Sequence, residues 1–292
     1  MKELRGVGVA LVTPFTKEGE VDFGGLTKLL EQTSQCDYYV VLGTTGESVT
    51  LSVQERAAVV RHVVGFNRGV RPIVMGVGGN NTAEVVRQLS ELDLEGVDAI
   101  LSVVPYYNKP SQEGIYAHYA EVLKNSPLPV VLYNVPGRTG VNMSAGTTLR
   151  LASDFPKKAV AVKEASGNLS QVAYILRDRP EGFLVISGDD NMTLPLLMFG
   201  GDGVISVSAN CFTEKMCQMV HAALDGDNRV ARERSLELFE ATDLLFKEGN
   251  PVGAKAALEI KGVGTATVRL PLVEASDSLK SELKNNMEKW KL

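Results

Sequence analysis

Lys163 is the residue of this 292-residue sequence whose type and position point most directly to chemistry. It interrupts the otherwise apolar run AVAVKEASG, which begins at Ala159. Side chains alternate between the two faces of a strand, so Lys163 shares its face with Ala161 and Ala165, whose small side chains leave room around the amine. Burial disfavours the charged form of a lysine, and the neutral amine attacks carbonyl groups. A Schiff-base lysine is therefore favoured over a structural one, because Glu164 faces away.

Hydroxyl groups and an arginine follow other apolar runs of the same kind. Tyr133 ends PVVLYNVPG, and its phenol could relay protons to a nitrogen or oxygen of a carbonyl adduct. Thr44 and Thr45 stand in the glycine-bounded turn GTTGE, where hydroxyls and backbone N–H groups can bind a carboxylate. Arg138 follows a Pro-Gly turn and offers a fork for a second carboxylate. Each also has an ordinary structural explanation: a buried tyrosine, a tight turn and a solvated arginine.

The elements that must position these side chains alternate regularly along the chain. Helical periodicity between short apolar runs predicts βα units, and runs without polar alternation predict strands buried on both faces. Eight such units favour a closed (β/α)₈ TIM barrel of the α/β class, whose functional groups gather at the carboxyl ends of the strands. The strand candidates are GVGVALVTPF, YYVVLGTTGE, PIVMGVGG, DAILSVVPYY, PVVLYNVPG, AVAVKEASG, FLVISGDD and GVISVSAN.

Helices are expected in each interval between these strands. Their starts are predicted near Asp22, Ser52 (with Glu55 as a capping box), Thr82, Ser111, Ser144, Asn168, and after Asn191 and Thr213. Three further helical patterns cover residues 228–247, 252–260 and 276–291. We therefore expect a catalytic barrel over residues 1–224 and a C-terminal helical extension over residues 225–292.

Composition and motif spacing exclude several classes of partner and cofactor. A net charge of −5 and a pI near 5.4 argue against nucleic acid or an anionic membrane as partner. Three cysteines with neither zinc nor redox spacing predict reduced thiols and a cytoplasmic protein, and the N-terminal apolar run is too short for a signal peptide. Three scattered histidines predict no metal site, and GVGGNN lacks the spacing of a dinucleotide fingerprint. No external cofactor is expected.

The strand-end motifs, taken together, resemble the dihydrodipicolinate synthase and N-acetylneuraminate lyase superfamily. GTTGE, VPYYNKPSQEG, YNVPGRTG, KEASGN, SGDD and GVISV occur in the order and at the intervals of that superfamily, over nearly the whole chain. Arg138 is similar to the arginine of the synthase branch, whereas the sialic-acid lyases typically lack it and carry GSTGE. The resemblance therefore implies condensation of pyruvate with L-aspartate 4-semialdehyde in lysine biosynthesis.

The resemblance also implies a role for each matching residue. Lys163 would form the Schiff base and Tyr133 would relay protons. Thr44 would connect Tyr133 to Tyr107, which in the family reaches in from a neighbouring subunit. Thr45 would bind the pyruvate carboxylate and Arg138 would orient the semialdehyde. Main-chain groups near Gly188 and Ile205 would support the carboxylate, and a homotetramer built as a dimer of dimers would follow from the shared tyrosine.

An interface pocket for lysine is the second site that the resemblance implies. Family members that lysine inhibits bind it through residues matching Ser48, Asn80, Glu84 and Tyr106 of this chain. Bacterial members of that type commonly carry histidines at the positions of Val53 and Arg56. Arg56 would place a cation beside a cationic ligand, so weak or absent lysine inhibition is expected.

Two other functions stay open at this point. A sister class I aldolase would use the same lysine to form or cleave a 2-keto-3-deoxy sugar acid or N-acetylneuraminate. A non-catalytic barrel could bind a metabolite and regulate a partner, although a binder has no need for an unpaired buried amine.

Overall fold

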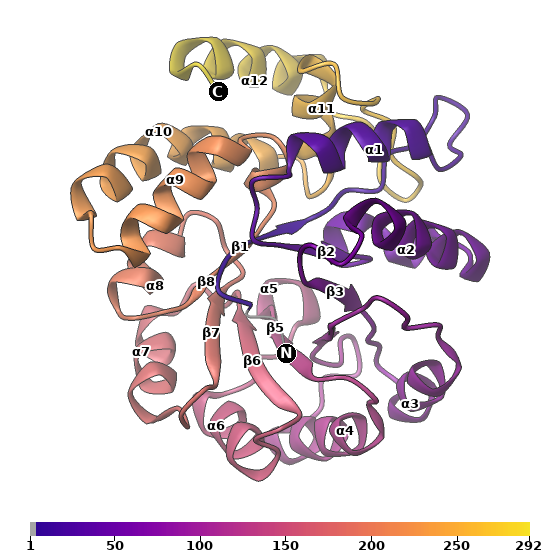
Figure 1. Ribbon diagram of the computed structural model, residues 1–292, viewed down its shortest axis with the longest axis vertical. Helices are drawn as coiled ribbons and strands as arrows, with labels where there is room; N and C mark the ends of the chain where they lie inside the picture. Colours follow the sequence, from indigo (N-terminus) through magenta and orange to yellow (C-terminus); the bar gives the residue numbers. More distant parts are fainter. Residues whose placement is uncertain (1–3) are drawn as a thin grey trace.

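The predicted apolar runs form eight parallel strands that close into a barrel in the computed structural model, which describes residues 4–292 (Figure 1). Each strand pairs with the next along the chain, and the last pairs with the first. This confirms the predicted (β/α)₈ barrel. The strands are β1 (Gly6–Ala10), β2 (Tyr38–Val41), β3 (Ile73–Gly76), β4 (Ala99–Val103), β5 (Val130–Asn134), β6 (Ala159–Glu164), β7 (Leu184–Ser187) and β8 (Gly203–Ser206).

Helices fill the intervals between strands, and short polar residues cap many of their first turns. Asp22, Ser52 and Asn168 each accept a hydrogen bond from a backbone N–H of the first turn, and Ser52 forms the predicted capping box with Glu55. The helices are α1 (Phe23–Gln32), α2 (Val53–Asn67), α3 (Thr82–Glu91), α4 (Gln112–Asn125), α6 (Ala145–Asp154), α7 (Leu169–Asp178), α8 (Thr193–Met198) and α9 (Thr213–Leu224).

The structure contains short helical turns at the strand ends that the sequence did not predict. The helix α5 (Pro136–Thr139) follows β5 and carries Arg138; proline at its first position suits a helix start. The 3₁₀ turns η1 (Thr44–Gly46) and η2 (Ser48–Thr50) follow β2. These turns are too short to show helical periodicity, yet they position the residues at the mouth of the barrel.

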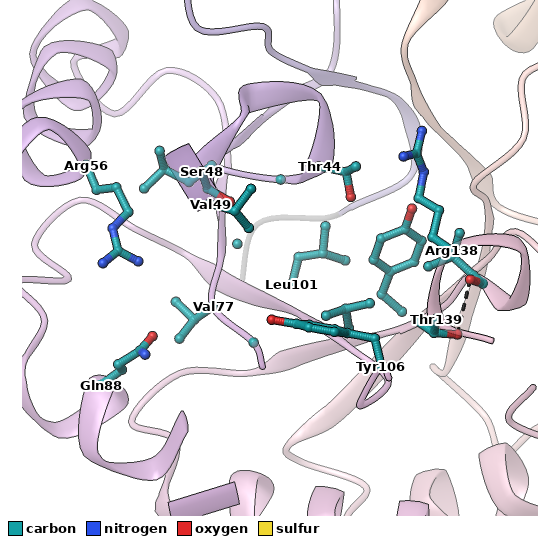
Figure 2. A pocket seen from close by; sticks show the side chains of 17 residues that line it. Thr44, Ser48, Val49, Arg56, Val77, Gln88, Leu101, Tyr106, Arg138 and Thr139 are labelled. Atoms are coloured by element: carbon teal, nitrogen blue, oxygen red, sulfur yellow. Dashed lines mark hydrogen bonds between the residues drawn. The ribbon is translucent and has the colours of Figure 1, made fainter. Parts of the chain in front are cut away.

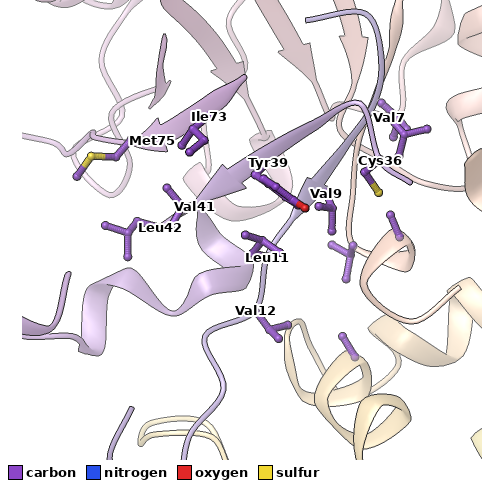
Figure 3. Close-up of a cluster of buried hydrophobic side chains, with 14 of the residues drawn as sticks. Val7, Val9, Leu11, Val12, Cys36, Tyr39, Val41, Leu42, Ile73 and Met75 are labelled. Atoms are coloured by element: carbon purple, nitrogen blue, oxygen red, sulfur yellow. The ribbon is translucent and has the colours of Figure 1, made fainter. Parts of the chain in front are cut away.

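Two hydrophobic cores lie on the opposite faces of the sheet. The outer core joins the strands to the surrounding helices, and Figure 3 shows its side chains from β1, β2 and β3. The inner core fills the barrel. Buried residues on both faces explain why the strands lack polar alternation. The inner residues are Leu4, Ala10, Tyr38, Val40, Val74, Ala99, Leu101, Val131, Tyr133, Val135, Ala161, Ile186 and Ile205.

The C-terminal segment forms three helices, α10 (Asn228–Phe246), α11 (Val252–Ile260) and α12 (Asp277–Trp290). Their bounds agree with the predicted ranges to within one residue. The helix α10 packs against α9 and is contacted by α11 and α12, and the four helices lie along one side of the barrel in Figure 1. The division into residues 1–224 and 225–292 stays a prediction, although the turn between α9 and α10 falls at that point. No helix of residues 4–292 is long and apolar enough to span a bilayer.

Candidate active site

Lys163 lies inside the barrel near the carboxyl end of β6, as its position in the strand predicted. Its side chain is only 6 % exposed. The strand register pairs it with Tyr133 of β5, and Lys163 Nζ lies 4.3 Å from the centroid of the Tyr133 ring. No carboxylate forms an ion pair with it within residues 4–292. The amine is therefore buried against a phenol ring without a counter-charge.

Gly188, at the end of β7, leaves the space that the Lys163 side chain occupies. A Cβ at position 188 would lie 2.7 Å from Cβ of Ala165 and 3.0 Å from Cγ and Cε of Lys163. Carbon atoms do not approach that closely without displacement, so no larger residue fits beside the lysine as it stands. The structure thus brings Lys163, Tyr133 and Gly188 together.

Glu164 points to the outside of the barrel, as period-2 alternation predicted. Its carboxylate accepts hydrogen bonds from Asn134 Nδ2, Gln171 Nε2 and the backbone N–H of Ser166. This network lies between the sheet and the helices, and it fully accounts for the buried charge. Glu164 is consequently a structural residue and no partner for Lys163.

A cavity of about 520 Å³ opens at the carboxyl ends of β2 to β5. Thr44, Tyr133 and Arg138 line one part of it, and Figure 2 shows Thr44 and Arg138 on the same side. These residues come from η1, β5 and α5, which are far apart in the sequence. The cavity therefore combines a phenol that contacts the buried amine with a hydroxyl and a guanidinium that could hold a polar substrate.

The far part of this cavity contains residues predicted for the lysine pocket. Ser48 and Arg56 line it, together with Gln88, which the sequence analysis missed, and Tyr106 lines the same cavity nearer to Thr139. In Figure 2, Arg56 and Gln88 lie at the end opposite Arg138. Arg56 has no ion-pair partner within residues 4–292. This end of the cavity is therefore lined by an uncompensated positive charge.

Two further residues of the predicted lysine pocket lie outside the cavity lining. Glu84 of α3 accepts hydrogen bonds from Arg87 and from Nε2 of Gln88. The Arg87 guanidinium holds the pKa of Glu84 low, at about 2. The backbone carbonyl of Asn80 accepts a hydrogen bond from Asn108. Within one chain, Glu84 and Asn80 are therefore hydrogen-bonded to neighbouring side chains and do not line the cavity.

Tyr107 is 87 % exposed and has a positive φ of 72°. It lies outside the cavity lining, and no contact to Lys163 or Thr44 joins it to the site within residues 4–292. Ile205 is buried in the inner core with Tyr133. A single chain therefore places Ile205 near the predicted site but does not bring Tyr107 to it.

The backbone around the GTTGE turn is strained. Leu42 and Glu47 both have positive φ values, of 58° and 50°, although neither is glycine. The carbonyl of Leu42 consequently approaches β3, where a Cβ on Gly76 would lie only 2.2 Å from that oxygen. Non-glycine residues in this conformation cost about 1 kcal/mol or more each and cluster at functional sites. The strain places Thr44 and Thr45 between two constrained positions.

The C-terminal segment supplies residues to this turn that sequence reasoning missed. Asn250 Nδ2 donates a hydrogen bond to Oγ1 of Thr45 at 3.0 Å. Lys255 of α11 forms an ion pair with Glu47, at 2.5 Å between Nζ and Oε1. Burial lowers the pKa of Lys255 to about 8. A lysine within the apolar stretch VGAKAALEI was the one sequence signal that could have indicated this pair.

Other titratable groups near the barrel have structural roles. Asp190 of the SGDD motif is buried and accepts hydrogen bonds from the backbone N–H groups of Val207 and Ser208. His118 is buried, which lowers its pKa to about 4, and His221 bonds to Asp37. The three cysteines are free and buried. Within residues 4–292 no group of three His, Cys, Asp or Glu side chains could hold a metal ion.

Comparison with known proteins gives matches over the whole fold. The model of the dihydrodipicolinate synthetase family matches residues 3–290. A 4-hydroxy-tetrahydrodipicolinate synthase of Parabacteroides distasonis is 52% identical over 92% of this chain and 91% of its own length. The 4-hydroxy-tetrahydrodipicolinate synthase of Azobacteroides pseudotrichonymphae is 48% identical over 96% of this chain and 95% of its own length. The solved structure of dihydrodipicolinate synthase from Acinetobacter baumannii, chloride inhibited and complexed with pyruvate, superposes with a TM-score of 0.95 at 36% identity, covering 99% of both chains. The chain therefore belongs to the dihydrodipicolinate synthetase family.

Proposed function

We propose that this chain is a 4-hydroxy-tetrahydrodipicolinate synthase, which condenses pyruvate with L-aspartate 4-semialdehyde through a Schiff base on Lys163. The observation that carries the proposal is the buried amine of Lys163, 4.3 Å from the Tyr133 ring and without a carboxylate partner within residues 4–292. A lysine amine that no carboxylate engages is available as the nucleophile that a carbonyl substrate requires.

The chemistry begins when the Lys163 amine attacks the keto carbon of pyruvate. The carbinolamine loses water to give an imine, and the imine then draws electrons from the methyl group, which loses a proton to form an enamine. The enamine carbon attacks the aldehyde of the second substrate. The amino group of that substrate then displaces Lys163 by transimination, which closes the ring and frees the enzyme. This sequence uses no external cofactor or metal.

Proton transfer and substrate binding are assigned to the residues around the cavity. The Tyr133 phenol, whose ring contacts the lysine amine, relays protons, with Thr44 beside it in the cavity. Thr45 binds the pyruvate carboxylate, with main-chain groups at Gly188 and Ile205 in support. Arg138 lines the same cavity and orients the carboxylate of the semialdehyde through its guanidinium fork.

Assembly into a homotetramer, as a dimer of dimers, is the second part of the proposal. The exposed Tyr107 side chain reaches the site of a neighbouring subunit, where Thr44 joins it to Tyr133. Val49 and Val53 are exposed apolar side chains at the start of the α2 region, and Met198 and Phe199 of the α8 region form a second exposed group. Light scattering should give a tetramer, and a fully active monomer would contradict the shared tyrosine.

A cytoplasmic location and small-molecule substrates complete the proposed function. The net charge of −5 disfavours nucleic acid and anionic membranes as partners. The free, buried cysteines are consistent with a reducing compartment.

A substrate comparison with an Arg138→Ala variant tests the assignment. The protein should condense pyruvate with L-aspartate 4-semialdehyde and should not cleave 2-keto-3-deoxy sugar acids or N-acetylneuraminate at a comparable rate. Arg138→Ala should raise the KM for the semialdehyde about ten- to hundred-fold, because a charged hydrogen bond contributes about 1.5 to 3 kcal/mol. Arg232→Ala, at an exposed position on α10, is the matched control. Faster cleavage of a sugar acid would favour the sister aldolase.

A further inference from the structure

Asn250 joins the C-terminal segment to the turn that carries Thr45. It lies between α10 and α11 with a side chain that is 7 % exposed, and its Nδ2 donates to Thr45 Oγ1 at 3.0 Å. Thr45 is itself 3 % exposed. This hydrogen bond is therefore buried, and it connects two residues that are 205 positions apart.

The direction of this bond determines what the Thr45 hydroxyl can do. A threonine hydroxyl has one proton to donate and lone pairs that accept two hydrogen bonds. Because Asn250 fills one lone pair, the hydroxyl proton must point away from Asn250. No group within residues 4–292 accepts that proton. Thr45 is consequently left with a free donor, which is what a carboxylate ligand needs.

The polar environment of Asn250 supports this orientation of its amide. Asn250 Oδ1 is buried without a hydrogen-bond partner. Rotating the amide by 180° would satisfy Oδ1 with the Thr45 proton, but it would leave both N–H groups of Nδ2 without partners, whereas the present orientation leaves one of them. Buried N–H groups without partners are rarer than under-satisfied carbonyl oxygens. With Asn250 as the donor and Thr45 as the acceptor, the Thr45 proton is left for a ligand carboxylate, whereas the rotated amide would occupy it.

The neighbouring contacts fix Asn250 relative to the turn. Glu47, two residues after Thr45, forms the buried ion pair with Lys255, five residues after Asn250. The backbone N–H of Arg269 donates to Oε2 of the same carboxylate. Two segments of the C-terminal region therefore hold the turn at Glu47, two residues from the Asn250 contact.

We infer that Asn250 is a positioning residue, which turns the Thr45 hydroxyl into a hydrogen-bond donor for the carboxylate of the bound 2-keto acid. The inference rests on the proposed function, in which Thr45 binds pyruvate. It assigns a role in substrate binding to the C-terminal helical region, which lies outside the barrel. Asn250 acts through Thr45 and needs no contact with the substrate.

Asn250→Asp and Asn250→Ala separate this role from a purely structural one. Aspartate has nearly the same shape but accepts the Thr45 proton, so it should raise the KM for pyruvate about ten- to hundred-fold. Alanine only frees the hydroxyl to rotate, and it should raise KM about two- to tenfold. In both variants kcat should change less than KM. Asn286→Asp, a second buried asparagine in the C-terminal region, is the matched control.

A double-mutant cycle with Thr45→Val distinguishes the hydroxyl from simple charge repulsion. If Asn250 acts through the hydroxyl, Asn250→Asp should leave the KM of the Thr45→Val variant unchanged to within about twofold. A further large increase in KM would show that the aspartate repels the substrate directly and would overturn the inference. An unchanged KM in both Asn250→Asp and Asn250→Ala would also overturn it. If the aspartate variant does not fold, Asn250→Ala decides the question.

Trapping of pyruvate by borohydride keeps this inference separate from the proposed function. Wild-type protein and each folded variant should form the reduced adduct on Lys163 at saturating pyruvate, with the Asn250 variants needing more pyruvate. An adduct in every protein at the same pyruvate concentration would refute the positioning role alone. No adduct in wild-type protein would refute the proposed function itself.

Discussion

Replacing Lys255 by methionine should destabilise the protein strongly, because it leaves the carboxylate of Glu47 buried without its partner. The two side chains are 1 % and 2 % exposed, and their charged atoms lie 2.5 Å apart. Lys255 Nζ also donates to the carbonyl of Thr267 and lies 3.9 Å from the Phe15 ring centroid. Removing the cation therefore loses these contacts and leaves the carboxylate of Glu47 buried without the charge that compensates its desolvation.

The expected magnitude follows from the complete burial of the pair. Breaking a buried ion pair by removing one partner costs about 3 to 5 kcal/mol. An unfolding entropy of about 2.1 cal/mol/K per residue gives about 0.6 kcal/mol/K for a chain of this length. The Tm should therefore fall by about 5 to 8 °C. Scanning calorimetry at a fixed heating rate measures this difference directly.

Two controls identify the buried carboxylate as the cause. The double variant Glu47→Gln/Lys255→Met removes both charges and should recover most of the loss, since no uncompensated charge then stays buried. Lys284→Met, at an exposed position on α12, should leave the Tm within about 1 °C. A double variant as unstable as Lys255→Met alone would refute the reasoning.

Three further results are expected. Gly188→Ala should lower kcat about a hundredfold in the condensation assay, because the added Cβ displaces Lys163; wild-type kcat would contradict the close packing. Hydrogen bonding to Arg269 holds the pKa of Glu55 at about 2, so the Tm difference between wild type and Glu55→Gln should be full above pH 4.5 and vanish as the pH falls towards 2; a constant difference would exclude the charge as its cause. Lysine should inhibit weakly or not at all in steady-state assays, because Arg56 lines the cavity; a submillimolar inhibition constant would overturn this.

The fold follows from sequence patterns because the strands and helices depend on local features. Each strand is a short, continuous apolar run, which is what burial on both faces of a parallel sheet requires. Helix starts at Asp22, Ser52 and Asn168 carry their own capping side chains. The opposite directions of Lys163 and Glu164 follow from strand alternation alone.

The contacts that complete the candidate site depend on long-range packing, so local patterns could not predict them. Asn250 and Thr45 are 205 residues apart, and a residue between two helices gives no sign of which turn it will meet. The positive φ of Leu42 accompanies a close approach of its carbonyl to β3, where Gly76, distant in the sequence, leaves room for it. The proposed role of Tyr107 requires a second subunit. Only the lysine within the apolar helix α11 could have indicated a buried partner from the sequence.

Reduction with borohydride in the presence of pyruvate tests the central claim most directly. Sodium borohydride should convert the imine into a stable pyruvyl adduct, and peptide mass spectrometry should locate it on Lys163. Lys255, the second buried lysine, is the internal comparison and should stay unmodified, because Glu47 engages its amine. An adduct on Lys163 alone is the result that this account predicts. Folded protein with no adduct, or with the adduct on another lysine, would contradict it.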